Sequence, residues 1–159
     1  MHVKNIDKSK AILKTLRGIS HASGVIKYLK KIDPYVCEEV VLSSLEDQGF
    51  EVARSKSYSG DGGCDGAVII YGKSYLIQTK RYSGHISKQH MERFVALCRK
   101  YRVHGLFVHT GKTGRHARRV AKNTNVTVVS GDSLVKLIKG KRFGLSPSLL
   151  HILTRIFKK

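Results

Sequence analysis

The feature that most constrains this chain is the segment 64–80, in which two short apolar runs flank the pair Gly72-Lys73. A two-residue turn signal between alternating apolar segments is typical of a β-hairpin. A further apolar alternation precedes it, separated by the glycine-rich loop at 59–63. The pattern therefore predicts an antiparallel meander with strands at about 50–57, 64–71 and 74–80.

Helical and strand patterns alternate on both sides of this meander. A helix is expected over 34–48, because Asp33-Pro34 supplies an N-cap and a proline at the first helical position. After the meander, Ser87 can cap a second helix, and the patterns then predict a strand at 104–109, a helix at 115–123, a strand at 126–130 and a helix at 132–139. This α-β-β-β-α-β-α-β order predicts an α/β fold, a mixed β-sheet flanked by helices on both faces.

The length of 159 residues suits one domain with its own core. We expect a basic helical N-terminal extension over 1–32, with one or two helices between 9 and 31. The domain itself should cover 33–140. We expect residues 141–159 to form a basic C-terminal helix whose wide apolar face packs on the core.

The charge is strongly unbalanced, since 30 Lys and Arg residues against 11 Asp and Glu residues give a net charge of +19. Such a field favours polyanionic partners, nucleic acid first among them. Nine of the eleven acidic residues fall between 32 and 92. An acidic patch in a basic molecule indicates a cation site within a phosphate-binding surface.

Cysteine usage and hydropathy bear on the compartment. The three cysteines form no C-x-x-C pair, no apolar stretch is long enough to span a bilayer, and the first 31 residues lack the apolar core of a secretory signal. We expect a cytoplasmic, nucleoid-associated protein without a membrane partner. Organellar targeting is the less favoured alternative, because the acid-poor N-terminus contains a single arginine, Arg17.

Polar residues collect at one end of the predicted hairpin. Gln78 and Lys80 share one face of their strand because side chains alternate. Pairing through a Gly72-Lys73 turn would set Asp65 opposite Lys80. A carboxylate, an amide oxygen and an ammonium would then meet, which suits a hard divalent cation and phosphodiester hydrolysis. The spacing by itself leaves open an ordinary cross-strand ion pair between Asp65 and Lys80.

Five ordered blocks add a family resemblance. They are DPYVCEEVVLSSLEDQGFEV, GDGGCDGAVI, YLIQTKRY, GLFVHTGKTGRHARRVAK and VTVVSGDSLVKLI. In this order they resemble the catalytic domain of Mrr-type restriction endonucleases, a group within the PD-(D/E)XK nuclease superfamily. The resemblance covers about 33–138 and implies a restriction-endonuclease-like fold.

The resemblance also implies roles for particular residues. Asp65 corresponds to the metal-binding aspartate, Gln78 and Lys80 form the Q-x-K version of the second motif, and Glu38 takes the place of the first-helix glutamate. The implied catalytic residues are thus Asp65, Gln78, Lys80 and Glu38, and the implied metal ligands are Asp65, Gln78 and Glu38. The cofactor expected is Mg²⁺, with Mn²⁺ as an alternative.

Two departures from the family pattern leave choices open. Cys37 stands where the family usually has phenylalanine, so Glu38 and its neighbour Glu39 both remain candidates for the site. Gln78 replaces an acid, and a neutral oxygen binds Mg²⁺ more weakly, so Glu38 or Asp61 would have to complete the metal shell. The alternative for Asp61 is an ordinary loop residue.

Several residues are candidates for contacts with the nucleic-acid backbone, although a solvated surface explains each one singly. They are Arg81, Tyr82, His85, Lys112, Arg115, Arg118 and Arg119.

The combined pattern predicts a Mg²⁺-dependent DNA endonuclease of the Mrr-like restriction type. Cutting both strands favours a homodimer, and residues 1–32 are too few for a target-reading domain, which favours a separate specificity partner. One alternative is a Holliday-junction or other structure-specific resolvase of the same superfamily. Another is a non-catalytic DNA- or RNA-binding protein on the nuclease fold. The sequence does not identify the DNA target.

Overall fold

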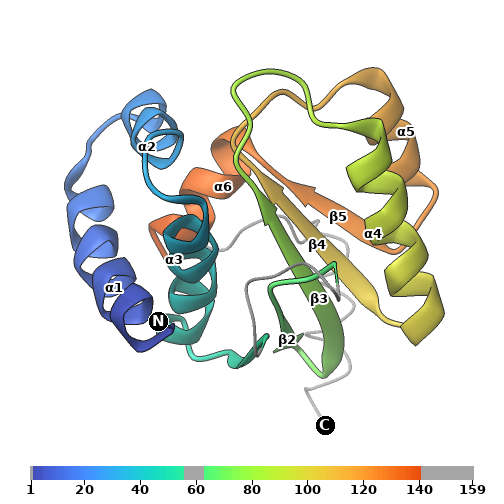
Figure 1. The fold of residues 1–159 in the computed structure, drawn as a ribbon, viewed down its shortest axis with the longest axis horizontal. Coiled ribbons are helices and arrows are strands. Elements are labelled where there is room, and N and C mark those ends of the chain that lie inside the picture. The colour runs from blue at the N-terminus through green and yellow to red at the C-terminus, as the bar shows by residue number, and fades with distance from the viewer. Residues whose placement is uncertain (1, 56–62, 141–159) are drawn as a thin grey trace, which may run out of the picture.

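The computed structural model describes residues 2–55 and 63–140, which form a five-stranded sheet between two layers of helices (Figure 1). The expected C-terminal helix at 141–159 and the candidate ligand Asp61 lie outside the described residues. The helices are α1 (His2–Gly18), α2 (Ala22–Leu29), α3 (Pro34–Asp47), α4 (Lys88–Tyr101), α5 (Arg115–Lys122) and α6 (Gly131–Ile138). The strands are β1 (Glu51–Arg54), β2 (Gly66–Ile70), β3 (Lys73–Lys80), β4 (His104–His109) and β5 (Val126–Val129).

The sheet confirms the predicted mixed topology. Its strands lie in the order β1-β2-β3-β4-β5. The first three are antiparallel, and β4 and β5 are added in parallel to β3 through helical crossovers. The chain from α3 to β5 therefore follows the expected α-β-β-β-α-β-α-β order.

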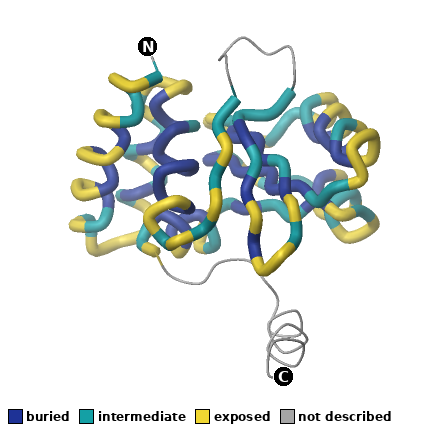
Figure 2. Tube along the Cα trace, turned by 90° about the horizontal axis from the view of Figure 1, so that it is seen from below, coloured by how far each residue is buried: buried dark blue, intermediate teal, exposed yellow. Residues whose placement is uncertain are grey.

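Helices cover both faces of the sheet. In Figure 1, α1, α2, α3 and α6 lie on one side of the sheet, while α4 and α5 lie on the other. Leu16 of α1 and Leu29 of α2 are fully buried in the same apolar cluster as Leu45 of α3. Figure 2 shows this buried interior between the exposed outer faces of the helices. The two N-terminal helices are therefore packed into the main core.

Two helices begin where the sequence signals place them. The Asp33 carboxylate accepts a hydrogen bond from the backbone N–H of Tyr35 at 2.9 Å, ahead of Pro34 at the start of α3. The Ser87 hydroxyl accepts one from the backbone N–H of His90 at 3.3 Å at the start of α4. Both caps satisfy amide groups that the helix itself leaves unpaired.

The turn between β2 and β3 differs from the sequence prediction by one residue. Ile70 pairs with Lys73, so the turn consists of Tyr71 and Gly72, with φ angles of 49° and 78°. Two successive positive φ values are typical of a type I′ turn, which prefers glycine at its second position. The ring of Tyr71 packs edge-on against Phe50, at a centroid distance of 6.1 Å, and this contact helps to hold a non-glycine residue in the turn.

This turn shifts the register of the hairpin. Gly66 lies opposite Ile77, and Asp65 consequently lies beside the next residue, Gln78. The predicted pairing of Asp65 opposite Lys80 is therefore wrong. Gln78 and Lys80 lie on one face of β3 because side chains alternate along a strand, and Asp65 lies beside Gln78 and not beside Lys80.

In the described part of the chain, no helix combines the length and the apolar character that crossing a membrane requires.

Candidate active site

Asp65 is fixed at the point where the chain enters β2. Its backbone N–H donates to the carbonyl oxygen of Ile77 at 2.7 Å. Its carboxylate Oδ2 accepts a hydrogen bond from the backbone N–H of Thr79 at 2.5 Å. These two bonds hold Asp65 against the end of β3. The carboxylate is bound at Thr79, the residue between Gln78 and Lys80.

Gln78 and Lys80 end β3 on the face of the sheet that α4 covers. Both side chains line one cavity of about 300 Å³ between β3 and α4. Their neighbour Ile77 belongs to the opposite core, against α3. The alternation of β3 thus delivers the amide of Gln78, which is only 9% exposed, and the ammonium of Lys80 to the same space.

Glu38, on α3, lies close enough to Asp65 and Lys80 for their charges to affect its pKa. Burial raises the pKa of Glu38 to about 8, the Asp65 carboxylate adds to the rise, and the Lys80 ammonium opposes it. Burial also raises the pKa of Asp65 to about 7, against the lowering effect of its hydrogen bond to Thr79 and of Lys80. Both carboxyl groups therefore hold their protons more strongly than an exposed carboxyl group does.

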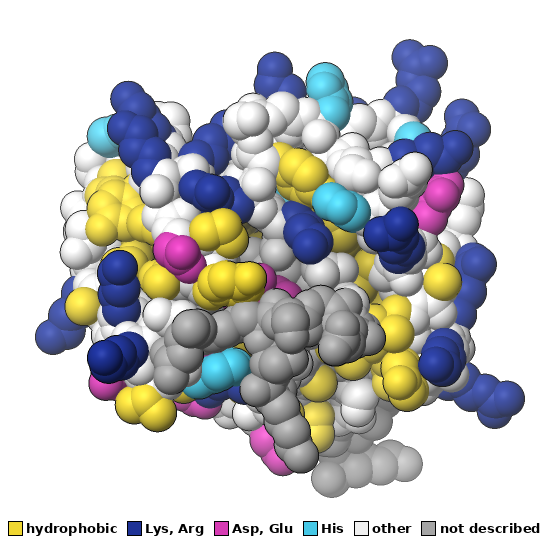
Figure 3. All heavy atoms as spheres, viewed as in Figure 1, with side chains coloured by type: hydrophobic (Ala, Val, Ile, Leu, Met, Phe, Trp, Pro, Cys, Tyr) yellow, Lys and Arg dark blue, Asp and Glu magenta, His cyan; other side chains and the backbone are white. Residues whose placement is uncertain are grey.

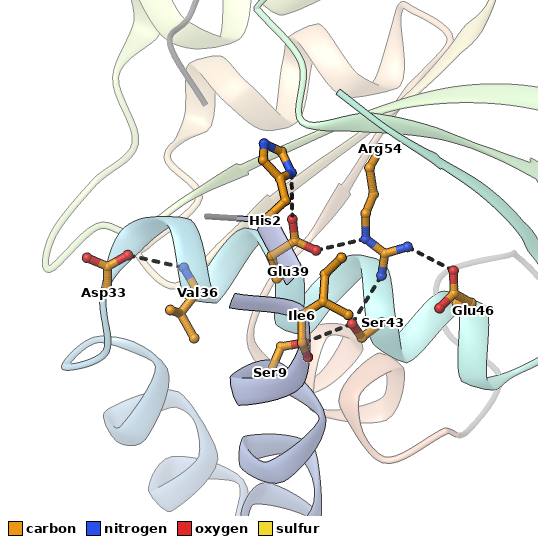
Figure 4. A network of polar contacts seen from close by, with 9 residues as sticks. All are labelled: His2, Ile6, Ser9, Asp33, Val36, Glu39, Ser43, Glu46 and Arg54. Atoms are coloured by element: carbon orange, nitrogen blue, oxygen red, sulfur yellow. Dashed lines mark hydrogen bonds and ion pairs between the residues drawn. The ribbon is translucent and has the colours of Figure 1, made fainter. Parts of the chain in front are cut away.

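The neighbouring Glu39 has different surroundings (Figure 4). Its carboxylate accepts a hydrogen bond from Nε of Arg54 on β1 at 2.8 Å, and its other oxygen lies 3.7 Å from Nδ1 of His2. The Glu39 side chain is 1% exposed. Although its charge contributes to the raised pKa of Asp65, the Glu39 carboxylate binds Arg54, so Glu39 joins α3 to the sheet.

The donor set fits a hard divalent cation. Within residues 2–55 and 63–140, no three His, Cys, Asp or Glu side chains are grouped so as to hold a metal. A site here would therefore combine the carboxyl groups of Asp65 and Glu38 with the amide oxygen of Gln78, all of them oxygen donors. Glu38 and Asp65 are half-buried carboxyl groups with raised pKa values, and a bound cation would stabilise their ionised state.

Two loops with predicted DNA-binding residues lie side by side just beyond the site. The Thr110 hydroxyl accepts from the backbone N–H of Tyr82 at 3.0 Å and donates to the carbonyl of Tyr82 at 2.9 Å. Further along, the backbone N–H of Lys112 donates to the carbonyl of Gly84 at 2.8 Å. His85 and Lys112 are bridged as a consequence, and both are exposed.

The other predicted contact residues are placed as follows. Arg81 is exposed, and its guanidinium donates to the carbonyl of Lys30 at 2.8 Å. Tyr82 is half-buried, and its hydroxyl is hydrogen-bonded to Nδ1 of His90. The remaining three, Arg115, Arg118 and Arg119, are exposed on α5. The face drawn in Figure 3 shows many more Lys and Arg side chains than Asp and Glu side chains.

The structure adds two residues that the sequence interpretation did not assign to the site. His90 and Arg93 of α4 line the cavity together with Gln78 and Lys80. Helical spacing was the available signal for these two residues. His90, Arg93 and Leu97 are separated by three and then four residues, so they lie on one side of the helix. The neighbouring side of α4 is apolar and consists of Met91, Phe94, Val95 and Cys98.

Comparisons with known proteins identify one family, and the similar solved structures include two restriction endonucleases. The sequence model of the family Mrr_cat, described as restriction endonuclease, matches residues 29–138. The structure is similar to that of the restriction endonuclease FokI, with a TM-score of 0.52 and 17% identity over 96% of this chain and 32% of FokI. The MspJI restriction endonuclease in complex with a 27-mer oligonucleotide gives a TM-score of 0.47 and 19% identity over 96% of this chain and 35% of MspJI.

The chain spans about a third of the length of each of these two enzymes. A search of curated proteins gave no match. The similarity to FokI supports the fold, a mixed sheet flanked by helices.

Proposed function

Because the chain belongs to the restriction endonuclease family Mrr_cat, we propose that it is a metal-dependent endonuclease that hydrolyses phosphodiester bonds in DNA. Two observations support this proposal: the Asp65 carboxylate is hydrogen-bonded to the backbone of Thr79, the residue between Gln78 and Lys80, and the side chains of Gln78 and Lys80 line one cavity. The alternative, an ordinary ion pair between Asp65 and Lys80, would account for neither the buried Gln78 nor the nearby carboxyl group of Glu38.

We propose that Asp65 and Gln78 hold the cation through their oxygen atoms and that Glu38 completes the set. Mg²⁺ suits oxygen donors of this kind, and Mn²⁺ can take its place. A divalent cation bound there would lower the pKa of a bound water and offset negative charge on a phosphate oxygen. The hydrogen bond from the Thr79 backbone to Asp65 fixes the orientation of the carboxylate.

Lys80 would act on the reacting groups directly. Its ammonium can orient the attacking water and stabilise the negative charge that develops on the scissile phosphate. This stabilisation is larger in a partly buried site than in bulk water, because the local dielectric constant is lower.

The exposed basic residues support DNA as the substrate. A net charge of +19 favours binding to the phosphate backbone irrespective of sequence. Each molecule offers one such site, so cleavage of both strands would require two copies, and we propose a homodimer or a second binding event. We also propose that target selection depends on a partner or on a segment other than α1 and α2, since those helices are packed into the core.

Plasmid cleavage tests the proposal. We expect supercoiled DNA to be nicked in the presence of Mg²⁺ or Mn²⁺ and to remain intact with EDTA. Lys80→Ala should reduce the rate by about 10²- to 10⁴-fold, because it removes a charge that acts on the transition state. The matched control is Lys73→Ala, at the opposite end of β3 and about 20 Å away, which should change the rate by less than about threefold.

The substrate panel separates the alternatives. Linear, supercoiled, modified and four-way-branched DNA should all be compared. Selective cleavage of branched DNA would identify a structure-specific resolvase. Retention of DNA in a gel shift without cleavage of any substrate would contradict the enzymatic proposal and identify a binding protein on the nuclease fold.

A further inference from the structure

We propose that the cavity between β3 and α4 binds a second phosphate of the DNA strand, adjacent to the one that is cleaved, through Arg93 and His90. The two residues lie on α4, across the cavity from Gln78 and Lys80. This role rests on the proposed nuclease function, because the first phosphate would occupy the site beside Lys80.

The charge of the cavity wall favours an anion. Lys80 and Arg93 are both cationic, and none of the described residues that line the cavity is acidic. Arg93 makes no hydrogen bond or ion pair with any other described residue, whereas the acid next to it, Glu92, interacts with Lys88 and His116. The guanidinium group of an arginine can bind two phosphate oxygens at once.

His90 is oriented by a neighbour outside the cavity. The hydroxyl of Tyr82 is hydrogen-bonded to Nδ1 of His90, and the two rings lie 5.9 Å apart. We propose that the Tyr82 hydroxyl is the donor in this bond and Nδ1 the acceptor. The neutral imidazole then carries its proton on Nε2, which remains available as a donor.

The three basic groups are close enough to influence one another. The pKa of His90 is lowered first by burial and then by the charges of Lys80 and Arg93. An anion placed among them would relieve this repulsion. The mutual repulsion of these groups and the absence of acidic residues among the described residues of the cavity wall therefore both indicate an anionic ligand.

The size and floor of the cavity suit a phosphodiester group. Its volume of about 300 Å³ is far larger than the roughly 30 Å³ that one water occupies in the liquid. Phe94 and Leu97 give it an apolar floor, which limits hydration and strengthens the interaction of a phosphate with Arg93.

Titration with small nucleotides tests the second phosphate site without requiring cleavage. Thymidine 3′,5′-bisphosphate contains no diester and can be titrated by calorimetry with Mg²⁺ present. We expect the wild-type protein to bind it about 10- to 100-fold more tightly than either thymidine monophosphate, because the second phosphate adds a charge-assisted contact.

Variants on α4 locate that contact. Arg93→Met should bring the affinity for the bisphosphate to within about threefold of the monophosphates, and His90→Gln should cause a smaller loss of the same kind. The matched control is Arg99→Met, an exposed arginine on another face of α4, which should keep the wild-type preference.

Equal binding of the bisphosphate and the monophosphates by the wild-type protein would overturn the proposed phosphate site. Equal losses for Arg93→Met and Arg99→Met would also overturn it. These outcomes are distinct from a failure of the proposed function. A protein that cleaves plasmid but shows no preference for the bisphosphate would keep the function and lose the second phosphate site. A protein that shows an Arg93-dependent preference but never cleaves DNA would keep the second phosphate site and lose the proposed function.

Discussion

At the scale of single residues, Glu38 and Glu39 show how strongly the surroundings of a carboxylate decide its role. Glu39 is buried against Arg54, with which it forms a short ion pair. Glu38 lies near another carboxyl group, and its pKa is raised to about 8. One glutamate stabilises the fold, and we infer that the other serves the site.

The two glutamates should respond in opposite ways to removal of their charge. Glu39→Gln removes the buried charge that pairs with Arg54 and should lower the free energy of unfolding by about 2–4 kcal/mol. Glu38→Gln should raise it by on the order of 1 kcal/mol at pH 8 in EDTA, because a destabilising buried charge is removed. Urea denaturation of both variants measures the difference, and a destabilised Glu38→Gln would contradict the assignment.

The pH dependence of the Glu38 effect follows from the direction of its pKa shift. The folded-state pKa of Glu38 lies above the ordinary value of 4.5, at about 8. Its protonated form is favoured by the folded state, so its stabilising contribution is complete below about pH 4.5 and is lost as the pH rises towards 8. The gain from Glu38→Gln should therefore be larger at pH 8 than at pH 5, and denaturation curves at the two pH values measure it. A gain that is independent of pH would mean that Glu38 does not titrate as described.

At the scale of elements, the two loops beyond β3 and β4 depend on a close backbone approach at Gly111. A Cβ atom at this position would lie 2.2 Å from the carbonyl oxygen of Gly84, and that oxygen belongs to the backbone. The glycine of the Thr110–Thr113 segment therefore serves to pair the loops. This pairing places His85 and Lys112 next to each other.

Gly111→Ala should separate the loops, lower stability by about 2 kcal/mol or more and weaken binding to DNA. Gly84→Ala is the matched control, because a Cβ atom there meets nothing within 4 Å, and it should cost less than about 1 kcal/mol. Thermal unfolding and fluorescence anisotropy measure the two effects. If both variants behave alike, the close approach does not hold the loops together.

Local signals were sufficient to predict most elements of this fold. Asp33 and Ser87 fix the starts of α3 and α4 through side-chain caps, and β4 occupies the predicted range 104–109. The hairpin register was not predictable in the same way, because two overlapping residue pairs can each form a two-residue turn. The contact of Tyr71 with Phe50, which accompanies the observed turn, is tertiary and leaves no local pattern.

The candidate site was predictable only in part, for a related reason. The shared face of Gln78 and Lys80 follows from strand alternation, and the family resemblance adds Asp65 as a candidate, although its predicted position opposite Lys80 was wrong. The choice between Glu38 and Glu39 required the position of Arg54 on β1. The cavity wall formed by α4 depends on helix–sheet packing, which helical spacing alone does not place.

At the scale of the whole molecule, the excess of positive charge should dominate the affinity for DNA. Binding that neutralises about five phosphates gives a slope near −4.5 in a plot of log K against log salt concentration. Arg118→Ala, on the exposed face of α5, should reduce the magnitude of this slope by about 1. Lys136→Ala, exposed on α6 in the other helix layer, should leave it unchanged. Anisotropy titrations between 50 and 300 mM KCl measure the slopes, and equal effects of the two variants would exclude the α5 surface.

We propose that Asp65, at the entrance of β2, holds a divalent cation beside Lys80. Titration of the protein with Mn²⁺, followed by electron paramagnetic resonance of the free ion, tests it most directly. We predict that the wild-type protein and Asp132→Asn, which changes an exposed aspartate on α6, bind Mn²⁺ alike, whereas Asp65→Asn loses at least about tenfold in affinity. Mn²⁺ binding by Asp65→Asn that equals binding by the wild-type protein would contradict the claim.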